Sequence, residues 1–136
     1  MSSSINKVIL VGNLGANPEF RQFENGDKIC TLSVATNSNW KDKVTKEWRE
    51  ITQWHRVVVR SSNLVKVCER RLSKGMKLYL EGMIESRKWT DATGQVKFLT
   101  EIVLRPYRSE LQILQATSNQ SLKPDFMASE SIDVPF

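Results

Sequence analysis

The sequence is poor in the residues that build metal and thiol sites. It has two cysteines, Cys30 and Cys68, and a single histidine, His55. Neither a CxxC pair nor the cysteine and histidine spacing of a zinc site is present, so no metal is expected. Two buried free thiols are favoured over a disulfide, because the chain starts without a recognisable secretory leader.

Long apolar runs are also missing. No stretch approaches the roughly 18 apolar residues that a membrane span requires. The longest apolar run near the start, residues 8–11, is too short for the core of a signal peptide. These absences predict a cytoplasmic protein without a membrane partner.

Motifs of common enzymes are absent as well. The Gly-rich phosphate-binding loop does not occur, and the acidic residues of the first 108 positions are scattered among lysines. His55 has no serine, cysteine or aspartate at a catalytic spacing. We expect neither catalysis nor a cofactor. A small nuclease or hydrolase, the alternative from another class, lacks the carboxylate cluster that two catalytic metals require.

Charge is abundant and unevenly placed. The chain has 20 Lys and Arg against 15 Asp and Glu, a net charge of +5. Residues 1–108 have a net charge of +8, whereas residues 109–136, with one lysine and four acids, have a net charge of −3. A basic body predicts a polyanionic partner, and an acidic tail predicts a separate role.

Two-residue alternation of apolar and polar side chains dominates the basic body, which is typical of β-strands. Residues 61–73 instead repeat apolar side chains with helical spacing and predict one helix. The charged segment 37–49 predicts a long exposed loop or a flexible hairpin. Strands are expected at residues 7–14, 28–36, 50–60, 77–89 and 96–105.

Five strands with one helix after the third are the element order of an OB-type Greek-key barrel, a mainly β fold, although other small barrels share this periodicity. We therefore expect one OB-fold domain at residues 1–108. The alternation ends after Tyr107, and the C-terminal residues are interrupted by Pro124 and Pro135. Residues 109–136 are thus expected to form a disordered acidic tail.

Three tryptophans stand among cations and are candidates for base stacking. Trp40, Trp54 and Trp89 each have a lysine or arginine within two positions. Burial in a core is the ordinary alternative, but a core would reject the charged residues that share the faces of Trp54 and Trp89. Aromatic rings among cations are typical of proteins that bind single-stranded nucleic acid. Trp48 is left open between exposure and packing against the barrel.

The strand expected at residues 50–60 has two different faces, because alternate side chains of a strand point to opposite sides. Trp54, Arg56 and Arg60 share one face, which suits an anion that carries bases. His55 lies on the other, apolar face, where a buried or interface histidine is expected.

Several short motifs succeed one another along the basic body. They are Asn6 to Gly15 with Pro18-Glu19, Ala35-Thr36 with Trp40, Glu50 with Trp54 to Val58, Lys74-Gly75, Tyr79 to Gly82, and Arg87 to Asp91 with Gly94-Gln95. Their succession over about residues 5–105 closely resembles the bacterial single-stranded DNA-binding protein family. The ordered set is far more specific than any one of its motifs.

This resemblance implies an OB-fold homotetramer that wraps single-stranded DNA in replication, recombination and repair, associated with the nucleoid in a bacterial cytoplasm. It implies that the three tryptophans stack on bases and that His55 belongs to the subunit interface. The basic residues that match the family's DNA path are Lys7, Lys43, Arg56, Lys74 and Lys88. The resemblance also implies a C-terminal tip that docks on partner enzymes, made here of Asp133, Val134, Pro135 and Phe136.

Three positions depart from the family's pattern. Arg60 stands where a base-contacting phenylalanine is usual, which exchanges a stacking platform for a cation on the DNA path. Lys77 replaces an interface glutamine and brings like charges together in a tetramer. The tip has only Asp133, supported by Glu130, in place of a run of aspartates, so docking and mere solubilisation both remain open for the tail.

The sequence thus predicts a sequence-nonspecific single-stranded DNA-binding protein that is not an enzyme. The closest alternative is an RNA-binding or primosome-type OB protein of lower oligomeric state, because the OB fold hosts many functions.

Overall fold

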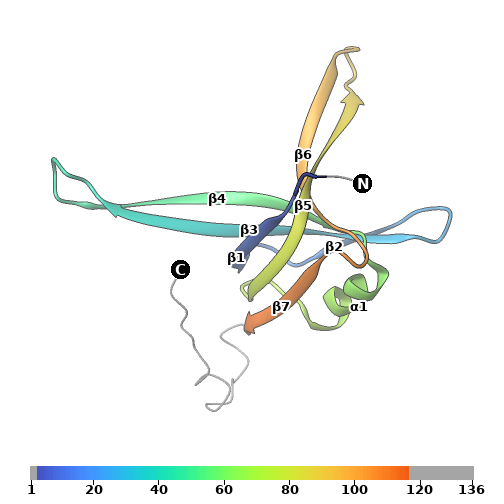
Figure 1. Ribbon diagram of the computed structural model, residues 1–136, viewed down its shortest axis with the longest axis horizontal. Coiled ribbons are helices and arrows are strands. Elements are labelled where there is room, and N and C mark those ends of the chain that lie inside the picture. Colours follow the sequence, from blue (N-terminus) through green and yellow to red (C-terminus); the bar gives the residue numbers. More distant parts are fainter. Residues whose placement is uncertain (1–2, 117–136) are drawn as a thin grey trace.

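Two long hairpins project from a small β-barrel in the computed structural model, which describes residues 3–116 (Figure 1). The elements in chain order are β1 (Val8–Leu14), β2 (Glu19–Gln22), β3 (Lys28–Lys41), β4 (Trp48–Val59), α1 (Ser62–Arg71), β5 (Lys77–Thr90), β6 (Val96–Leu104) and β7 (Glu110–Gln115).

Five of these strands close the barrel. Their order is β1-β3-β4-β6-β5, and β5 pairs back with β1. β4 and β6 run parallel, and the other neighbours in the barrel run antiparallel. The helix α1 comes directly after β4, which is the third strand of the barrel. The expected five-stranded OB-type barrel with one helix after its third strand is therefore confirmed.

Two strands are added outside the barrel. β2 forms a hairpin with β3 through a turn at Gly26, whose φ of 95° is a conformation that glycine adopts readily. β7 pairs with β5, and its Leu111 and Ile113 pack against the core. The expectation that regular structure ends near Ser109 is therefore wrong for residues 110–115. Only Gln112 separates these two apolar side chains, and they pack against the core only because β7 pairs with the edge of β5. Residues 117–136 of the expected tail lie outside the described residues.

The barrel interior accounts for the alternation in the sequence. Its side chains come from alternate positions of the strands, and each buried aliphatic side chain stabilises the fold by roughly 1.5–3 kcal/mol. The most deeply buried include Cys30, Leu32 and Val34 of β3, Val57 and Val59 of β4, and Leu78 and Leu80 of β5.

Helix α1 packs against one end of this core. It begins after Ser61, whose hydroxyl oxygen accepts the backbone N–H of Leu64, and it buries Val65 and Cys68. Cys30 and Cys68 are both buried free thiols, as expected. No helix in the described part of the chain is long and apolar enough to cross a membrane.

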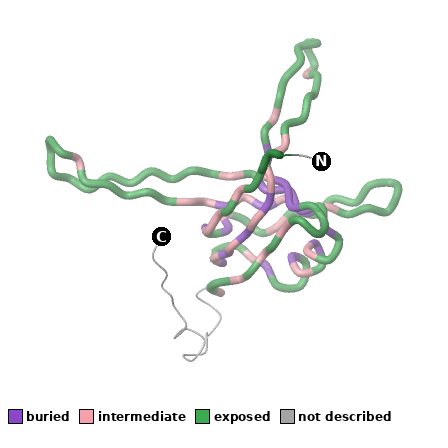
Figure 2. Tube along the Cα trace, viewed as in Figure 1, coloured by how far each residue is buried: buried purple, intermediate pink, exposed green. Residues whose placement is uncertain are grey.

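Beyond the barrel, the two hairpins contain no buried residue (Figure 2). We name the end of the β3–β4 hairpin, residues 35–54, the long arm, and the end of the β5–β6 hairpin, residues 86–100, the short arm. The segment 37–49 is thus a regular hairpin, because its ladder continues out to Lys41 and Trp48. Asp42 closes the turn, since its carboxylate accepts the backbone N–H groups of Val44 and Thr45 at 2.8 and 3.1 Å.

Candidate nucleic-acid interface

Trp54 lies at the base of the long arm, on the outer face of the sheet. Its side chain is 62% exposed, and its partner across the ladder is the small Ala35. A Cβ atom built on Gly15 would lie only 2.3 Å from the indole Cζ3 atom. The ring therefore rests against the chain at Gly15, where only glycine leaves room for it, while most of the ring stays open to a base.

A hollow of about 290 Å³ adjoins Trp54. Arg56 lines it from β4, and Ala16 and Asn17 line it from the loop after β1. The Asn17 carboxamide oxygen accepts the backbone N–H of Lys74 at 2.8 Å. The structure therefore brings three of the sequence-predicted site residues, Trp54, Arg56 and Lys74, to one region.

A buried carboxylate links the bases of the two arms. Glu101 of β6 is only 5% exposed, and its two oxygens accept hydrogen bonds from the Nε atoms of Arg56, at 2.7 Å, and Arg87, at 3.3 Å. Burial alone would raise the pKa of the Glu101 carboxyl, but the hydrogen bonds and charges of the two arginines outweigh it and lower that pKa below its usual value. Glu101 is therefore ionised at neutral pH and orients two cations whose side chains stay half exposed.

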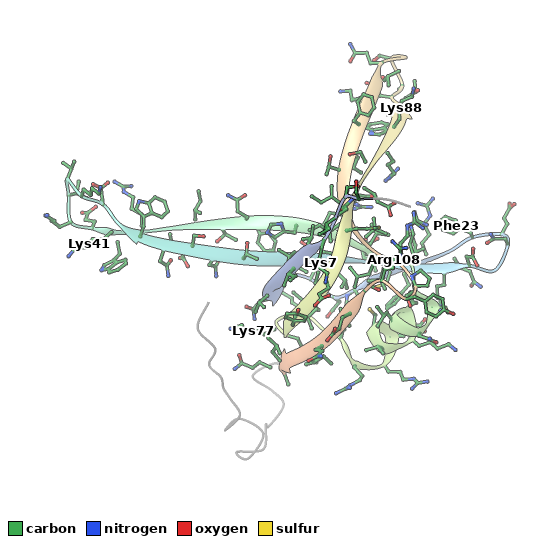
Figure 3. All side chains as sticks on the ribbon, viewed as in Figure 1. Lys7, Phe23, Lys41, Lys77, Lys88 and Arg108 are labelled. Carbon is green, nitrogen blue, oxygen red and sulfur yellow. The ribbon has the colours of Figure 1, made fainter. Side chains whose placement is uncertain are left out.

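The long arm carries two further tryptophans, one on each face. Trp40 is 45% exposed and faces Arg49 across the ladder, whereas Trp48 is 71% exposed and faces Lys41. Lys41 lies near the far end of the arm (Figure 3). By alternation, Trp48 shares the face of Trp54, and Trp40 lies on the opposite face. The sequence left open whether Trp48 is exposed or packs against the barrel. The structure shows that it is exposed and does not pack on the barrel.

The short arm repeats this arrangement. Trp89 is 44% exposed and faces Lys97, whose ammonium lies 3.7 Å from the carboxylate of Asp91. Arg87 lies on the same face, so aromatic and cationic side chains continue from one arm to the other in the order Trp54, Arg56, Arg87 and Trp89. The expected exposure of Trp40, Trp54 and Trp89 is confirmed, and their contact with DNA stays a prediction.

Other predicted site residues lie elsewhere. Lys43 is exposed in the turn of the long arm, and Lys88 is exposed on the short arm (Figure 3). Lys7 lies just before β1 and forms an ion pair with Glu81 at 3.4 Å. Its ammonium therefore already has an anionic partner.

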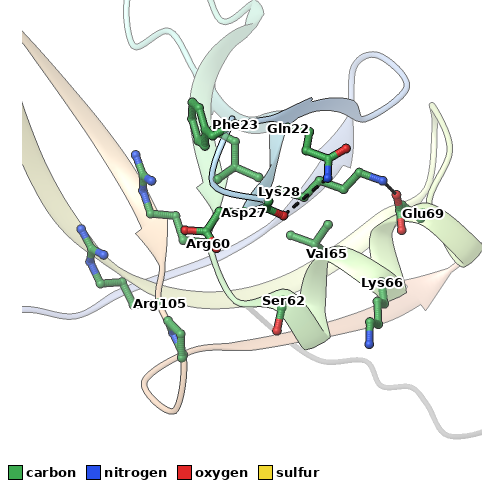
Figure 4. A pocket seen from close by; sticks show the side chains of 13 residues that line it. Gln22, Phe23, Asp27, Lys28, Arg60, Ser62, Val65, Lys66, Glu69 and Arg105 are labelled. Atoms are coloured by element: carbon green, nitrogen blue, oxygen red, sulfur yellow. Dashed lines mark hydrogen bonds and ion pairs between the residues drawn. The ribbon is translucent and has the colours of Figure 1, made fainter.

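Arg60 lies at a different end of the molecule from the tips of the arms. It lines a cleft of about 610 Å³ between the β2–β3 hairpin, the start of α1 and the end of β6, together with Phe23, Lys66 and Arg105 (Figure 4). Lys28 in the same cleft is paired with Glu69. Arg60 thus directly follows the end of β4, four residues after Arg56, and its place on a DNA path stays a prediction.

The residues expected at a subunit interface are His55 and Lys77. His55 lies on the face opposite Trp54, half-buried, and its Nε2 atom is 2.9 Å from the hydroxyl of Thr36. Lys77 starts β5, where it pairs with Asn13 of β1 and Gln115 of β7. The face of His55 agrees with the sequence prediction, and the role of both residues in assembly stays a prediction. The tip Asp133, Val134, Pro135 and Phe136 lies outside the described residues.

Sequence reasoning missed two residues of this surface. Glu101 gives no local signal, because its arginines are 14 and 45 positions away. Phe98 of β6 is 71% exposed and faces Lys88. It was missed because the alternating positions Val96, Phe98 and Thr100 look like one face of an ordinary strand. Within residues 3–116, no group of three or more histidine, cysteine or acidic side chains is placed to hold a metal ion.

The barrel, its two arms and the exposed aromatic residues on them define an OB-type nucleic-acid-binding architecture. The model of the single-strand binding protein family matches residues 5–114. The chain therefore belongs to the single-strand binding protein family.

Relatives and a solved structure agree with this assignment. A single-stranded DNA-binding protein of Rickettsia felis is 48% identical over 130 residues, which cover 96% of this chain and 86% of the relative. Its counterpart in Rickettsia prowazekii is 50% identical over 122 residues, or 89% of this chain and 80% of that protein. The solved complex of Plasmodium falciparum SSB with single-stranded DNA aligns with a TM-score of 0.76 at 37% identity, covering 85% of this chain and 99% of that one.

Proposed function

We propose that this protein binds single-stranded DNA without sequence preference, by stacking bases on the tryptophans of its two arms. The observation that carries the proposal is the pairing of exposed rings with cations. Three tryptophans, Trp40, Trp48 and Trp89, each face a lysine or arginine directly across a ladder, and Trp54 has Arg56 two positions along its strand.

Such a surface favours unpaired bases. A base inside a duplex has both faces covered by its neighbours, whereas an unpaired base can stack on an indole for about 1–3 kcal/mol. Because every base has an aromatic face, the surface tolerates any sequence.

The cations add a contribution to DNA affinity that weakens as the salt concentration rises. Arg56, Lys43, Lys74 and Lys88 are exposed and suited to phosphates, and each phosphate contact adds about −0.7 to the slope of log affinity against log salt. A strand lying from Trp54 past Arg56 and Arg87 to Trp89 would meet rings and cations in turn.

We also propose assembly as a homotetramer. β1 pairs with β3 only at Asn13 and Leu14, so its edge from Val8 to Gly12 has β5 on one side, and no strand among residues 3–116 pairs with it on the other. Ile9 on this strand is half exposed. An unpaired strand edge beside an exposed apolar side chain is suited to a second copy. His55 and Lys77 are the further interface candidates.

The cellular role derives from single-strand binding and from the tail. We propose that the protein coats and protects single strands in DNA replication, recombination and repair, in the bacterial nucleoid. Phe136 would supply an apolar anchor with Asp133 close by in the sequence, features that a basic-rimmed apolar pocket on a partner enzyme of DNA metabolism would capture.

Intrinsic tryptophan fluorescence tests the proposal, with oligo-dT, duplex DNA and RNA as titrants and the mass of each complex measured by light scattering. Oligo-dT should quench strongly and duplex DNA weakly. Equal quenching by both would contradict stacking, and tighter binding of RNA than of DNA would favour the RNA-binding alternative. Labelled oligo-dT that is cut in the presence of Mg²⁺ would favour a nuclease.

A further inference from the structure

We propose that Phe98 and Lys88 form a further base-binding pair on the face of the short arm opposite Trp89, so that single-stranded DNA contacts both faces of this arm. The inference rests on the proposed function and extends it to an aromatic residue outside the tryptophan set.

The ladder of the short arm places the two side chains together. Lys88 of β5 is the direct partner of Phe98 of β6, and the adjacent pair is Trp89 and Lys97. Directly opposed residues share a face with Cβ atoms about 4.5–5.5 Å apart, and neighbouring positions point to the other face. Each face of the arm therefore presents an aromatic ring directly opposite a lysine, Trp89 opposite Lys97 and Phe98 opposite Lys88.

The exposure of Phe98 has no structural explanation in the described fold. Its side chain is 71% exposed, as much as Trp48 and more than Trp40 or Trp89. It lies beyond the last buried residues of β5 and β6, so it adds nothing to the core. An exposed phenylalanine on a projecting hairpin is instead a ring available for stacking.

The charge around Phe98 fits a polyanion. In the part of the chain that the structure describes, Lys88 has no acidic partner, whereas Lys97 on the other face is close to Asp91. The hydroxyls of Ser86 and Thr100, 3.2 Å apart, lie one pair further toward the barrel, about 7 Å along the strands. They can donate to phosphate or base oxygens. The ladder residues on this face are Ser86, Lys88, Thr90, Val96, Phe98 and Thr100, and none is acidic.

A second copy of the chain is the other occupant that this face could take, since Val96 is also half exposed. An apolar or uncharged protein surface over this face would bury Lys88 without a counter-charge, which is costly. A phosphate supplies that charge while its base covers Phe98. The geometry and the charge together favour single-stranded DNA.

The pair of Phe98 and Lys88 is tested by measuring the affinity for labelled oligo-dT of three variants substituted at Phe98. Phe98→Ala should weaken binding about 5- to 150-fold, which corresponds to the loss of one stacked base. Phe98→Tyr should bind like the wild type, and Phe98→Leu should resemble the alanine variant, because a leucine side chain keeps the apolar contact and loses the aromatic face. Tyr107→Ala is the matched control, since Tyr107 is fully exposed and lies on neither arm.

A direct contact is tested on the unmodified protein by cross-linking to an oligo-dT that contains 5-iodouracil. The cross-linked peptide should contain Phe98, and this readout remains valid if a variant fails to fold. Wild-type affinity of Phe98→Ala would overturn the inference, as would a changed mass of that variant without DNA, which would assign the face to a second copy. If the wild type itself neither binds oligo-dT nor shows quenching, the proposed function fails instead.

Discussion

The position of the exposed Trp54 ring depends on Gly15, which has no side chain. Any side chain at position 15 would clash with the indole, because a Cβ atom on Gly15 would lie 2.3 Å from the ring. The conflict involves the far end of the tryptophan rather than backbone, so the ring would move and the barrel would not. Gly15 is thus expected to act on DNA binding through the placement of Trp54.

A double-mutant cycle measures this dependence. Trp54→Ala should weaken oligo-dT binding by about 1–3 kcal/mol, and Gly15→Ala should cost part of the same amount because it displaces the ring. In the Trp54→Ala background, Gly15→Ala should have no further effect on affinity. Additive losses in the double variant would show that Gly15 contributes independently of the tryptophan.

Glu101 acts at the same scale by fixing two arginines. Its folded-state pKa is lowered, so its ionised form stabilises the fold above the unfolded-state pKa of about 4.3, and this stabilisation is lost as the pH falls through the folded-state pKa. The lost stabilisation comes from the contacts with Arg56 and Arg87.

Replacing Glu101 by Gln should expose this pH dependence. At pH 7 the variant should unfold in urea with a free energy about 1–3 kcal/mol below the wild type, since charged hydrogen bonds are lost while the half-exposed arginines regain water. The difference should shrink as the pH falls below about 4.3, because the carboxyl then takes up a proton in the unfolded wild type while it is still ionised in the folded one. It should vanish once the pH is below the lowered folded-state pKa. A difference that stays constant down to pH 3 would rule out Glu101 ionisation as its source.

At the scale of elements, β7 and the arms extend the barrel in different ways. β7 contributes to stability, because Leu111 and Ile113 cover part of the core beside β5. The arms bury nothing and instead hold side chains away from the barrel on both faces of a two-stranded ladder. We therefore expect the arms to contribute to binding and β7 to contribute to folding.

Two truncations separate these contributions. A chain ending after Arg108 lacks β7 and should lose about 1–3 kcal/mol of unfolding free energy in urea, because two partly buried aliphatic side chains and a ladder are removed. A chain ending after Ala116 retains β7 and should be as stable as the full chain. Equal stability of the two truncated chains would mean that β7 adds nothing to the fold.

At the scale of the whole molecule, charge is divided between a basic body and an acidic tail. The body of residues 1–108 carries +8 and the remainder −3, so the tail has the same sign of charge as DNA, and we expect it to compete weakly for the same cations. We therefore expect affinity for DNA and recruitment of partners to depend on different parts of the chain.

Deletion of residues 133–136 tests that separation. The shortened protein should no longer capture a partner helicase or exonuclease, because the apolar anchor Phe136 and the acidic Asp133 are gone. Its affinity for oligo-dT should stay equal or rise slightly, since an anion near the basic surface is removed. If the shortened protein still captured the same partners from a lysate cleared of nucleic acid, the tail would only solubilise the protein.

The sequence by itself determined the barrel and the exposed tryptophans. Alternation is a local property, so the strands containing Leu32, Val57 and Leu78 are visible in the order of residues, and the cations beside Trp54 and Trp89 exclude those rings from a core. The helix could be read in the same way from its Ser61 cap and its spacing.

Only the tertiary structure decided which side chains meet. The pairs of Trp40 with Arg49, Trp89 with Lys97 and Phe98 with Lys88 depend on ladder register, which distant strands establish together. Glu101 reaches Arg56 because β6 lies parallel to β4, and β7 forms because β5 has an edge to offer. Burial and pairing between distant segments are set by the whole fold, so no local pattern in the sequence contains them.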